Sequence, residues 1–239
     1  DIGISTINYN KEYKTLVIAY TNANIDLIKN NTIINISDIE RKQILGNKTI
    51  NNIFFIGKDA YLSCGFGIVV LDISKEEIRD TYYIGDEGSQ VNVLALTKDQ
   101  NDTLFAGSDK GLYKAYAKDP NLANFTSWHK DPMIDSTATY NTITWFAGKV
   151  FVNKKKGSVT SDTICTFSNG TWSRWQQDLY HPVMHLSSND KYLVVTYDSI
   201  VKAFNTNLEL FLQVPGFSYP LYAIADQDGL FWTGTKYTG

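Results

Sequence analysis

INNIFFIGKDAYLSCGFGIVVLDISKEEIRDTYYI, residues 50–84, is the stretch that decides the fold. It holds four short apolar runs separated by turn residues such as Gly57-Lys58-Asp59 and Ser74-Lys75-Glu76. Runs of this length between turns predict consecutive antiparallel strands joined by tight connections. The strands are expected at 50–56, 60–65, 68–73 and 77–84.

The same unit recurs along the whole chain. An apolar start of the first strand is found at residues 4, 50, 91, 140, 183 and 221, a mean step of about 43 residues. A period of 40–50 residues filled with short strands is typical of a β-propeller. We therefore predict an all-β propeller of four-stranded blades. The repeats lie near 4–46, 47–89, 90–137, 138–180, 181–218 and 219–239.

The units also predict local detail. We expect the first strand of each blade to be apolar because it lies near the central axis. The second strand is expected to be covered on both faces by neighbouring blades. Gly65, Gly107 and Gly234 recur near its end, where space is tight or where only glycine adopts the required φ. The fourth strand of the third repeat is weak and is expected near 125–129.

The sixth repeat stops after the run that ends at Thr235. End blades without a neighbour would expose apolar faces. Three arrangements are therefore open: a closed ring of five or six blades, an arc of a larger ring, or a ring completed by a partner. Because the chain starts at Asp1 and stops at Gly239 within repeats, we expect an arc of about five blades plus part of a sixth. Residues 1–239 then form a single propeller domain or segment.

Composition excludes several classes of protein. The net charge of −3 and the pI near 5.6 offer no electrostatic attraction for nucleic acid. The only basic run, at residues 154–156, is interpreted as a solvated hairpin tip. No apolar stretch has the ~18–20 residues needed to span a bilayer, so no transmembrane segment is predicted. Cys64 and Cys165 lie in apolar strands and are expected to be buried free thiols.

No set of residues resembles a catalytic or metal centre. His181 and His185 are four apart, but Pro182 and the start of a strand lie between them, so they would not share a helix face. The run from Asp226 to Gly229 starts like a calcium loop without its later ligands, and is interpreted as a turn. We predict no catalytic residue, no metal site and no cofactor. An enzyme would need paired carboxylates at a central pocket, and the acidic residues mostly fall in turns.

Aromatic residues provide the candidate binding surface. They make up 13% of the chain, and they gather with basic residues at two places. Such groups stack on sugars or on partner proteins, although they also cover the joints between blades. The candidate residues are Trp128, His129, Trp172, Arg174 and Trp175.

Two segments resemble a known repeat. LYAIADQDGLFWTGT at 221–235 and DTLFAGSDKGLY at 102–113 look like the two-component regulator propeller repeat. That repeat has an apolar start, an Asp-x-x-Gly turn, a Leu-Trp-x-Gly-Thr strand and a Gly-Leu start to the next strand.

A closer resemblance covers about residues 4–128. YKTLVIAY at 13–20, NIDLI at 24–28, KTINNI at 48–53 and AYLSCGFGIVVLD at 60–72 resemble the N-terminal propeller of PorZ-type proteins. These are surface components of the type IX secretion system of Bacteroidetes. The resemblance implies a parent with two seven-bladed propellers and a C-terminal export domain, of which this chain would be part.

The resemblance also implies a function. The expected role is a non-catalytic interaction scaffold in the attachment complex that joins secreted cargo to anionic lipopolysaccharide at the outer membrane and cell surface. The expected partners are other secretion-system surface proteins and lipopolysaccharide or another glycan. The alternative is the periplasmic propeller of a hybrid two-component regulator that senses a ligand.

Overall fold

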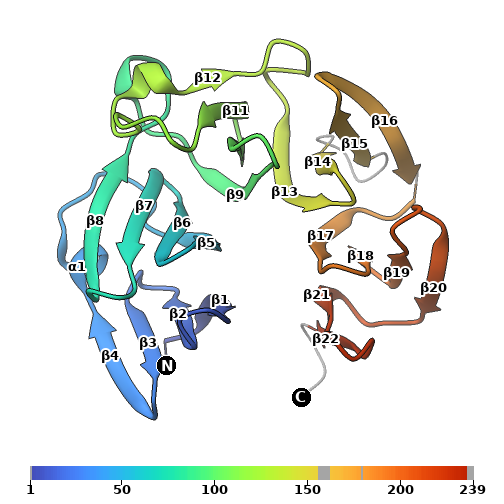
Figure 1. Cartoon of the computed structure of the whole chain (residues 1–239), viewed down its shortest axis with the longest axis horizontal. Helices are drawn as coiled ribbons and strands as arrows, with labels where there is room; N and C mark the ends of the chain where they lie inside the picture. Colours follow the sequence, from blue (N-terminus) through green and yellow to red (C-terminus); the bar gives the residue numbers. More distant parts are fainter. Residues whose placement is uncertain (1, 156–161, 179, 236–239) are drawn as a thin grey trace.

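The structure is a computed structural model and describes residues 2–155, 162–178 and 180–235. Within these residues the chain forms five four-stranded antiparallel sheets and one two-stranded sheet. The sheets are arranged around a common axis, and the first strand of each lies nearest to it (Figure 1). The prediction of an all-β propeller with four-stranded blades is confirmed.

The strands pair in chain order within every sheet. The first three blades consist of β1 (Ile4–Asn10), β2 (Thr15–Tyr20), β3 (Ile25–Lys29) and β4 (Thr32–Ile36); β5 (Ile50–Ile56), β6 (Asp59–Cys64), β7 (Gly67–Asp72) and β8 (Glu77–Tyr82); β9 (Val93–Lys98), β10 (Thr103–Ser108), β11 (Gly111–Tyr116) and β12 (His129–Lys130). The next two blades and the last hairpin consist of β13 (Thr139–Phe146), β14 (Lys149–Lys155), β15 (Asp162–Ser168) and β16 (Thr171–Asp178); β17 (Val183–Ser188), β18 (Leu193–Tyr197), β19 (Ile200–Phe204) and β20 (Leu210–Pro215); β21 (Pro220–Ala225) and β22 (Phe231–Thr235). The short helices in the connections are α1 (Asp38–Arg41), η1 (Asp86–Gly88) and η2 (Phe125–Ser127).

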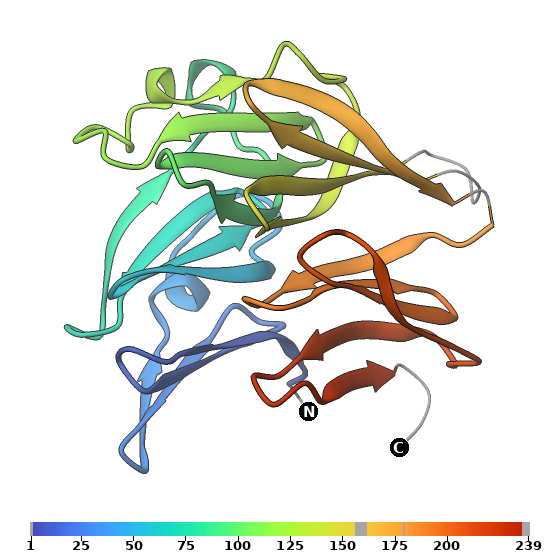
Figure 2. The ribbon, with the colours of Figure 1, turned by 45° about the vertical axis from the view of Figure 1, so that its right-hand side comes forward.

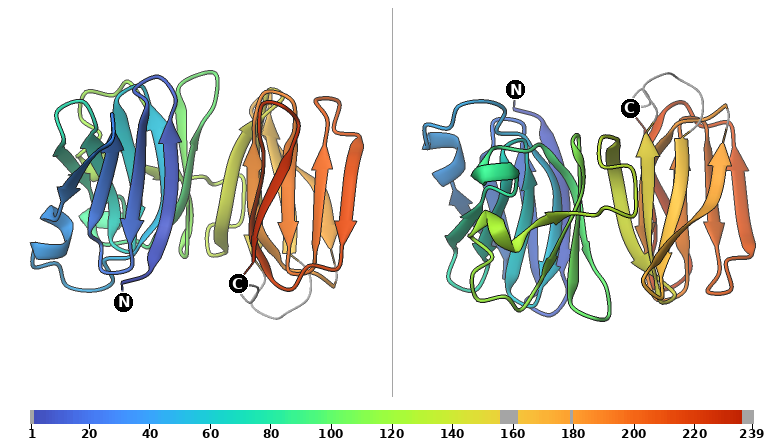
Figure 3. Two further views of the ribbon diagram at one scale, coloured as in Figure 1. Left: turned by 90° about the horizontal axis from the view of Figure 1, so that it is seen from below. Right: turned by 90° about the horizontal axis from the view of Figure 1, so that it is seen from above.

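Neighbouring blades pack face to face (Figure 2). Seen from the side, the strands run along the axis, so the turns gather at the two ends of the molecule (Figure 3). This arrangement leaves the turns and the outermost strands as the surface on which a propeller presents its functional residues.

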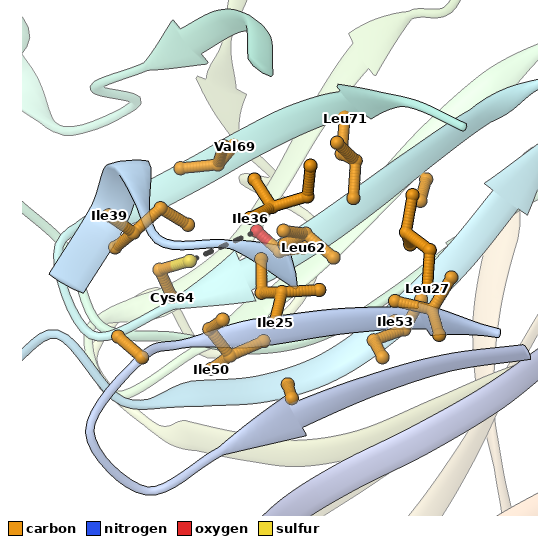
Figure 4. Close-up of a cluster of buried hydrophobic side chains, with 14 of the residues drawn as sticks. Ile25, Leu27, Ile36, Ile39, Ile50, Ile53, Leu62, Cys64, Val69 and Leu71 are labelled. Atoms are coloured by element: carbon orange, nitrogen blue, oxygen red, sulfur yellow. Dashed lines mark hydrogen bonds between the residues drawn. The ribbon is translucent and has the colours of Figure 1, made fainter. Parts of the chain in front are cut away.

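Alternating apolar positions build the joint between the first two blades. Val17 in β2 and Ile25 in β3 are fully buried, and they pack in one cluster with Leu62 and Cys64 of β6 (Figure 4). Burial raises the pKa of the Cys64 thiol, which donates to the Leu62 carbonyl at 3.4 Å. Cys64 therefore behaves as a small buried hydrophobe, as predicted.

Cys165 departs from that prediction. It is a free thiol like Cys64, but it is only half-buried. It lies beside an irregularity in the pairing of β15 with β16, between Ile164 and Cys165. The residue skipped there is Trp175 of β16, so β15 keeps its alternation: Ile164 and Thr166 are buried, and Cys165 lies on the other, less covered face of the strand.

A β-bulge marks the start of the first strand in all five blades and in the last hairpin. Pairing with the second strand skips one residue each time, namely Ser5, Asn51, Leu94, Asn141, Met184 and Leu221. The residue before each bulge marks the same position in every blade. Ile50 holds this position in the second blade, and Val93 and Pro220 hold it in the third blade and the last hairpin. The repeat starts predicted at residues 91 and 221 are therefore wrong. Val91 misled the sequence argument because a shift of two residues preserves the alternation of a strand.

Bulged asparagines fasten one blade to the next. Asn51 Nδ2 donates to the Val93 carbonyl at 2.6 Å, and Asn141 Nδ2 donates to the Val183 carbonyl at 3.1 Å. Both acceptors begin the first strand of the following blade. The expectation of an apolar first strand is therefore wrong at Asn51 and Asn141. The carbonyls of Val93 and Val183 in the next blade need hydrogen-bond donors near the axis, and asparagine supplies them.

The recurring glycines divide into two cases. A Cβ on Gly107 would lie 2.6 Å from the Tyr140 carbonyl oxygen, and one on Gly65 would lie 2.4 Å from the Asn47 carbonyl oxygen. Neither has a left-handed φ, so close approach of backbone is the reason for glycine at both positions. A Cβ on Gly234, in the last hairpin, would meet nothing within 4 Å. Gly234 pairs with Tyr222 as Gly107 pairs with Ala95, but the described residues place no further blade beside it.

The first blade and the last hairpin expose apolar faces. On the first blade, Tyr9, Leu16, Ile28 and Ile33 lie opposite one another across four strands, and Ile33 is 65% exposed. On the strands of the last hairpin the exposed large apolar side chains are Tyr222, Ile224 and Trp232. A hydrogen bond from Lys11 Nζ to Gln227 Oε1 (3.0 Å) links the first blade to the last hairpin.

Other expectations met different outcomes. Residues 125–127 form η2 instead of a strand, and the fourth strand of the third blade is only His129–Lys130. Of the basic run, Lys154 lies in β14 and pairs with Asp135 at 2.6 Å, whereas residue 156 lies outside the described residues. No helix in the described part of the chain is long and apolar enough to cross a membrane.

Candidate functional site

The outer rim of the third blade has a depression of about 610 Å³, a volume that would hold a small ligand. It lies where β12 starts late: Lys130 pairs with Tyr113 and His129 pairs with Lys114, but the residues before His129 form no strand opposite Ala115 and Tyr116. We call this hollow the rim depression. Its lining includes Lys114, Tyr116, Asp119, Thr126, His129 and Lys130.

Local hydrogen bonds turn the chain away from the sheet at this point. The Asn124 side chain accepts from Thr126 N and caps η2. Ser127 Oγ donates to the Asn121 carbonyl at 3.1 Å. Asparagine and serine favour such local side-chain-to-backbone bonds over continued strand pairing. The third blade therefore has a short outer strand and an open rim.

The rim depression combines an aromatic ring with polar groups. Tyr116 is 52% exposed and His129 is also exposed. Thr126 adds a hydroxyl and Asp119 a carboxylate. Such a surface is able to stack on an apolar ring face and to exchange hydrogen bonds with hydroxyl groups. It contains no hydrogen-bonded nucleophile and base among the described residues.

Two of the predicted tryptophans pack in joints between blades near the third blade. Trp128 is only 4% exposed, its Nε1 donates to the Leu122 carbonyl at 3.0 Å, and its ring lies 6.3 Å from that of Tyr82. Trp172 of β16 donates from Nε1 to Asp131 Oδ2 at 2.7 Å. Trp128 and Trp172 therefore fill joints between blades and hold the rim in place.

Asp131 connects the third and fourth blades. It is fully buried, and Lys114 Nζ lies 2.9 Å from the same Oδ2 that accepts from Trp172. The Lys114 cation also lies 5.1 Å from the centre of the Phe167 ring. The ion pair is therefore part of a joint, and it fixes one wall of the rim depression.

The remaining two predicted residues lie elsewhere. Trp175 packs edge-on against Phe151 and Phe204, with ring centres 5.0 and 4.8 Å away, in the joint between the fourth and fifth blades. Arg174 is exposed and donates to Gln177 Oε1 at 3.0 Å. Of the five predicted residues, the structure thus brings only His129 into the lining of the rim depression. Trp128, Trp172 and Trp175 lie in joints between blades.

Sequence reasoning missed Tyr116, Asp119 and Thr126 as lining residues. Two features of the sequence could have indicated these residues: the length of the third repeat and its weak fourth strand. A blade that departs from the repeat pattern in this way has extra residues that can form a surface feature. The step from the third to the fourth repeat start is the longest in the chain.

Residues 1–129, more than half of the chain, match the family model described as the N-terminal β-propeller domain of PorZ from the type IX secretion system. The chain belongs to this PorZ family. No curated protein sequence matched the chain.

Solved structures share the fold of this PorZ-family chain. PorZ of Porphyromonas gingivalis, described as an essential bacterial surface component of the type IX secretion system, aligns with a TM-score of 0.75 and 20% identity. The alignment covers 92% of this chain and 28% of PorZ. The extracellular domain of BT4673 from B. thetaiotaomicron, described as a one-component system, aligns with a TM-score of 0.66 and 12% identity, over 97% of this chain and 31% of that one. The chain therefore spans about a third of the length of these two proteins or less.

A Ser–His–Asp group outside the rim depression does not have the geometry of a catalytic relay. Asp198 Oδ1 and Ser199 Oγ both approach Nδ1 of His181, at 2.9 and 3.1 Å. A relay needs the carboxylate and the nucleophile on different ring nitrogens. The described residues also contain no group of three His, Cys, Asp or Glu side chains suited to a metal ion.

His185 lies in the joint between β17 and β21. Its Nδ1 is buried without a hydrogen-bond partner among the described residues, and its ring lies edge-on to Tyr222 with centres 4.7 Å apart. Burial lowers the pKa of His185 to about 4. Since an unfolded histidine has a pKa near 6.5, the unfolded chain binds a proton between about pH 6.5 and 4 that the folded chain does not bind.

We predict that His185→Phe makes folding less sensitive to acid. The stabilisation associated with neutral His185 is fully present above about pH 6.5 and is lost as the pH falls toward 4. The free energy of unfolding of the natural chain, relative to the variant, should therefore fall by about 1–3 kcal/mol between about pH 7 and 4. Urea denaturation at several pH values measures this difference. His129→Phe, at an exposed histidine, is the control; parallel profiles for the natural chain and His185→Phe would contradict the prediction.

Proposed function

We propose that this chain is a non-catalytic interaction scaffold, the propeller part of a type IX secretion component that is displayed outside the cytoplasm at the outer membrane or cell surface. The observation that carries this proposal is the family match over residues 1–129. The fold supports it, because rigid blades hold surface loops in fixed positions and so reduce the ordering cost of binding. Turnover of any glycan or peptide substrate by the purified chain would contradict the non-catalytic part.

We propose further that residues 1–239 form one propeller domain and an arc of a seven-bladed ring. In that arrangement β21 and β22 begin the sixth blade. The further strands cover the row from Tyr9 to Ile33 on one side and the face with Trp232 on the other. The exposure of these apolar side chains supports the proposal, because a complete ring buries such faces.

The rim depression is proposed to bind the polysaccharide of anionic lipopolysaccharide. Tyr116 offers a ring face to a sugar, and His129, Thr126 and Asp119 offer hydrogen-bonding groups. Lys130 adds positive charge for an anionic chain. Other secretion-system surface proteins are the second class of partner in this proposal, and they would contact the remaining turns.

The test measures binding of the purified chain to immobilised anionic lipopolysaccharide. Tyr116→Ala combined with His129→Ala should weaken binding about tenfold, as expected when a central aromatic contact is lost. Tyr9→Ala removes a ring of similar exposure, 53% against 52%, on a different blade and should leave the affinity unchanged. Equal binding by the double variant and the natural chain would refute the assignment of the rim depression. Copurification of the full-length protein with other secretion components tests the scaffold role separately.

A ligand-sensing propeller of a membrane-bound regulator is the second candidate. The structural similarity to the extracellular domain of BT4673 favours it. Recovery of the full-length protein with a kinase domain or partner, in place of secretion components, would support the sensor and contradict the scaffold.

A further inference from the structure

The connection between the first and second blades carries the most exposed large apolar side chain of the described residues. Leu45 is 90% exposed. It lies in the connection from α1 to β5, and it is not part of the apolar core of the first joint. Figure 1 shows where α1 and β5 lie, and Figure 4 shows that core with Ile39 of α1. Further blades beside β1–β4 would cover the opposite face of the first blade, so a completed ring would not bury Leu45. We call residues 41–48 the blade-one knob.

The knob is basic, whereas the chain as a whole is acidic. Residues 41–48 include Arg41, Lys42 and Lys48 and no carboxylate, against a net charge of −3 for the chain. Lys48 Nζ donates to the Glu40 carbonyl at 2.8 Å, and no carboxylate of the described residues pairs with Arg41 or Lys42. Two cations beside an exposed leucine, which follow Asp38 and Glu40 of α1, therefore have no ion-pair partner among the described residues.

Contacts at both ends hold the knob in one conformation. At its start, Lys42 N donates to the Asp38 carbonyl at 3.0 Å, and Ile44 packs against the core of the first joint. At its end, the Asn47 side chain accepts from both N and Oγ1 of Thr49, at 2.9 and 2.6 Å. A knob that is already ordered loses little conformational entropy when a partner binds.

The knob has a hollow as well as a protrusion. A depression of about 420 Å³ lies beside Leu45 and is lined by Arg41, Lys42, Ile44 and Lys48 among others. A bilayer surface would contact the protruding leucine but would not fill the hollow. A polypeptide with one apolar side chain for the hollow and carboxylates for the cations would match both shape and charge.

We propose that the blade-one knob binds an acidic segment of a partner protein. Leu45 and the hollow would exchange apolar contacts with that segment, while Arg41 and Lys42 would pair with its aspartate or glutamate side chains. Electrostatic attraction would speed association, and burial of Leu45 would slow dissociation. The proposal is independent of the rim depression, which lies on the third blade and for which a different ligand is proposed.

The experiment uses the whole chain labelled with nitrogen-15 and a panel of short peptides that combine leucine or phenylalanine with aspartate and glutamate. We expect at least one peptide to shift the amide resonances of residues 41–48. Leu45→Ser and Lys42→Glu should each weaken its binding about tenfold. Leu210→Ser and Lys110→Glu, at an exposed leucine and a lysine of other blades, are the matched controls and should bind the peptide as the natural chain does.

Charge-reversed peptides with lysine in place of the acidic residues, and vesicles of phosphatidylglycerol, complete the design. Equal binding of the charge-reversed peptides would overturn the proposal, as would vesicle binding through Leu45 without any peptide binding. Absence of shifts in residues 41–48 with every acidic peptide would overturn it as well. Because Leu45 is almost fully exposed, Leu45→Ser should melt at the same temperature as the natural chain, so that lost binding cannot be ascribed to unfolding.

Discussion

Gly107→Ala is expected to destabilise the chain by about 2–4 kcal/mol, whereas Gly234→Ala is expected to change its stability by less than about 0.5 kcal/mol. The Cβ of alanine at position 107 would lie 2.6 Å from the Tyr140 carbonyl oxygen, which belongs to the first strand of the next blade. Backbone cannot move aside as a flexible side chain would, so the third and fourth blades must separate. For a protein of this size the loss corresponds to a fall in Tm of roughly 5–15 °C.

The contrast between the two glycines also tests the proposed ring. Gly234 occupies the corresponding position in the last hairpin, where a Cβ would meet nothing within 4 Å. In a longer chain with a further blade beside β21 and β22, Gly234→Ala should become as damaging as Gly107→Ala. Thermal melts of both variants in chains of both lengths measure this. If Gly107→Ala does not lower the stability, the packing argument is contradicted. If Gly234→Ala does not lower the stability of the longer chain, the proposed ring is contradicted.

Asp131→Ala is expected to have a similarly large effect, about 2–4 kcal/mol. The substitution removes a fully buried carboxylate and leaves two half-buried donors, Lys114 Nζ and Trp172 Nε1, without their acceptor. Donors that lose their partner in a partly closed joint cost more than the pair contributed, so the damage comes mainly from the partners that remain. Because these residues also fix a wall of the rim depression, ligand binding there should fall too.

A double-mutant cycle checks the cause of that loss. Lys114→Met removes the cation but keeps a long apolar side chain, so it should restore part of the stability lost in Asp131→Ala. Urea denaturation of the two single variants and the double variant gives the coupling free energy. Additive losses would show that the pair does not act as a unit, and a cost below about 0.5 kcal/mol for Asp131→Ala would contradict the assigned role.

The candidate site could be predicted only in part. Trp128, Trp172 and Trp175 were found because aromatic residues cluster with basic ones, but the structure shows these rings in joints between blades. Local sequence does not reveal whether an aromatic ring faces a neighbouring blade or solvent. His129 lies in the rim depression, but the depression itself exists because η2 replaces part of the fourth strand.

The β-bulges and the asparagine hydrogen bonds between blades could not be predicted from the sequence either. Asn51 and Asn141 look like ordinary polar interruptions of an apolar strand, and their role depends on the carbonyls of Val93 and Val183 in the next blade. These contacts join residues about forty positions apart, so no window of local pattern contains both partners.

The amino-acid sequence alone determined the all-β class, the four-stranded unit and its repetition, because strand alternation and turn chemistry are local properties of a few adjacent residues. Tertiary structure alone decided which faces meet, where the bulges turn the first strands, which aromatic rings are buried and where the third blade opens into a depression. These features arise between blades, where packing and backbone hydrogen bonds link residues from separate repeats, and only the assembled molecule brings those residues together.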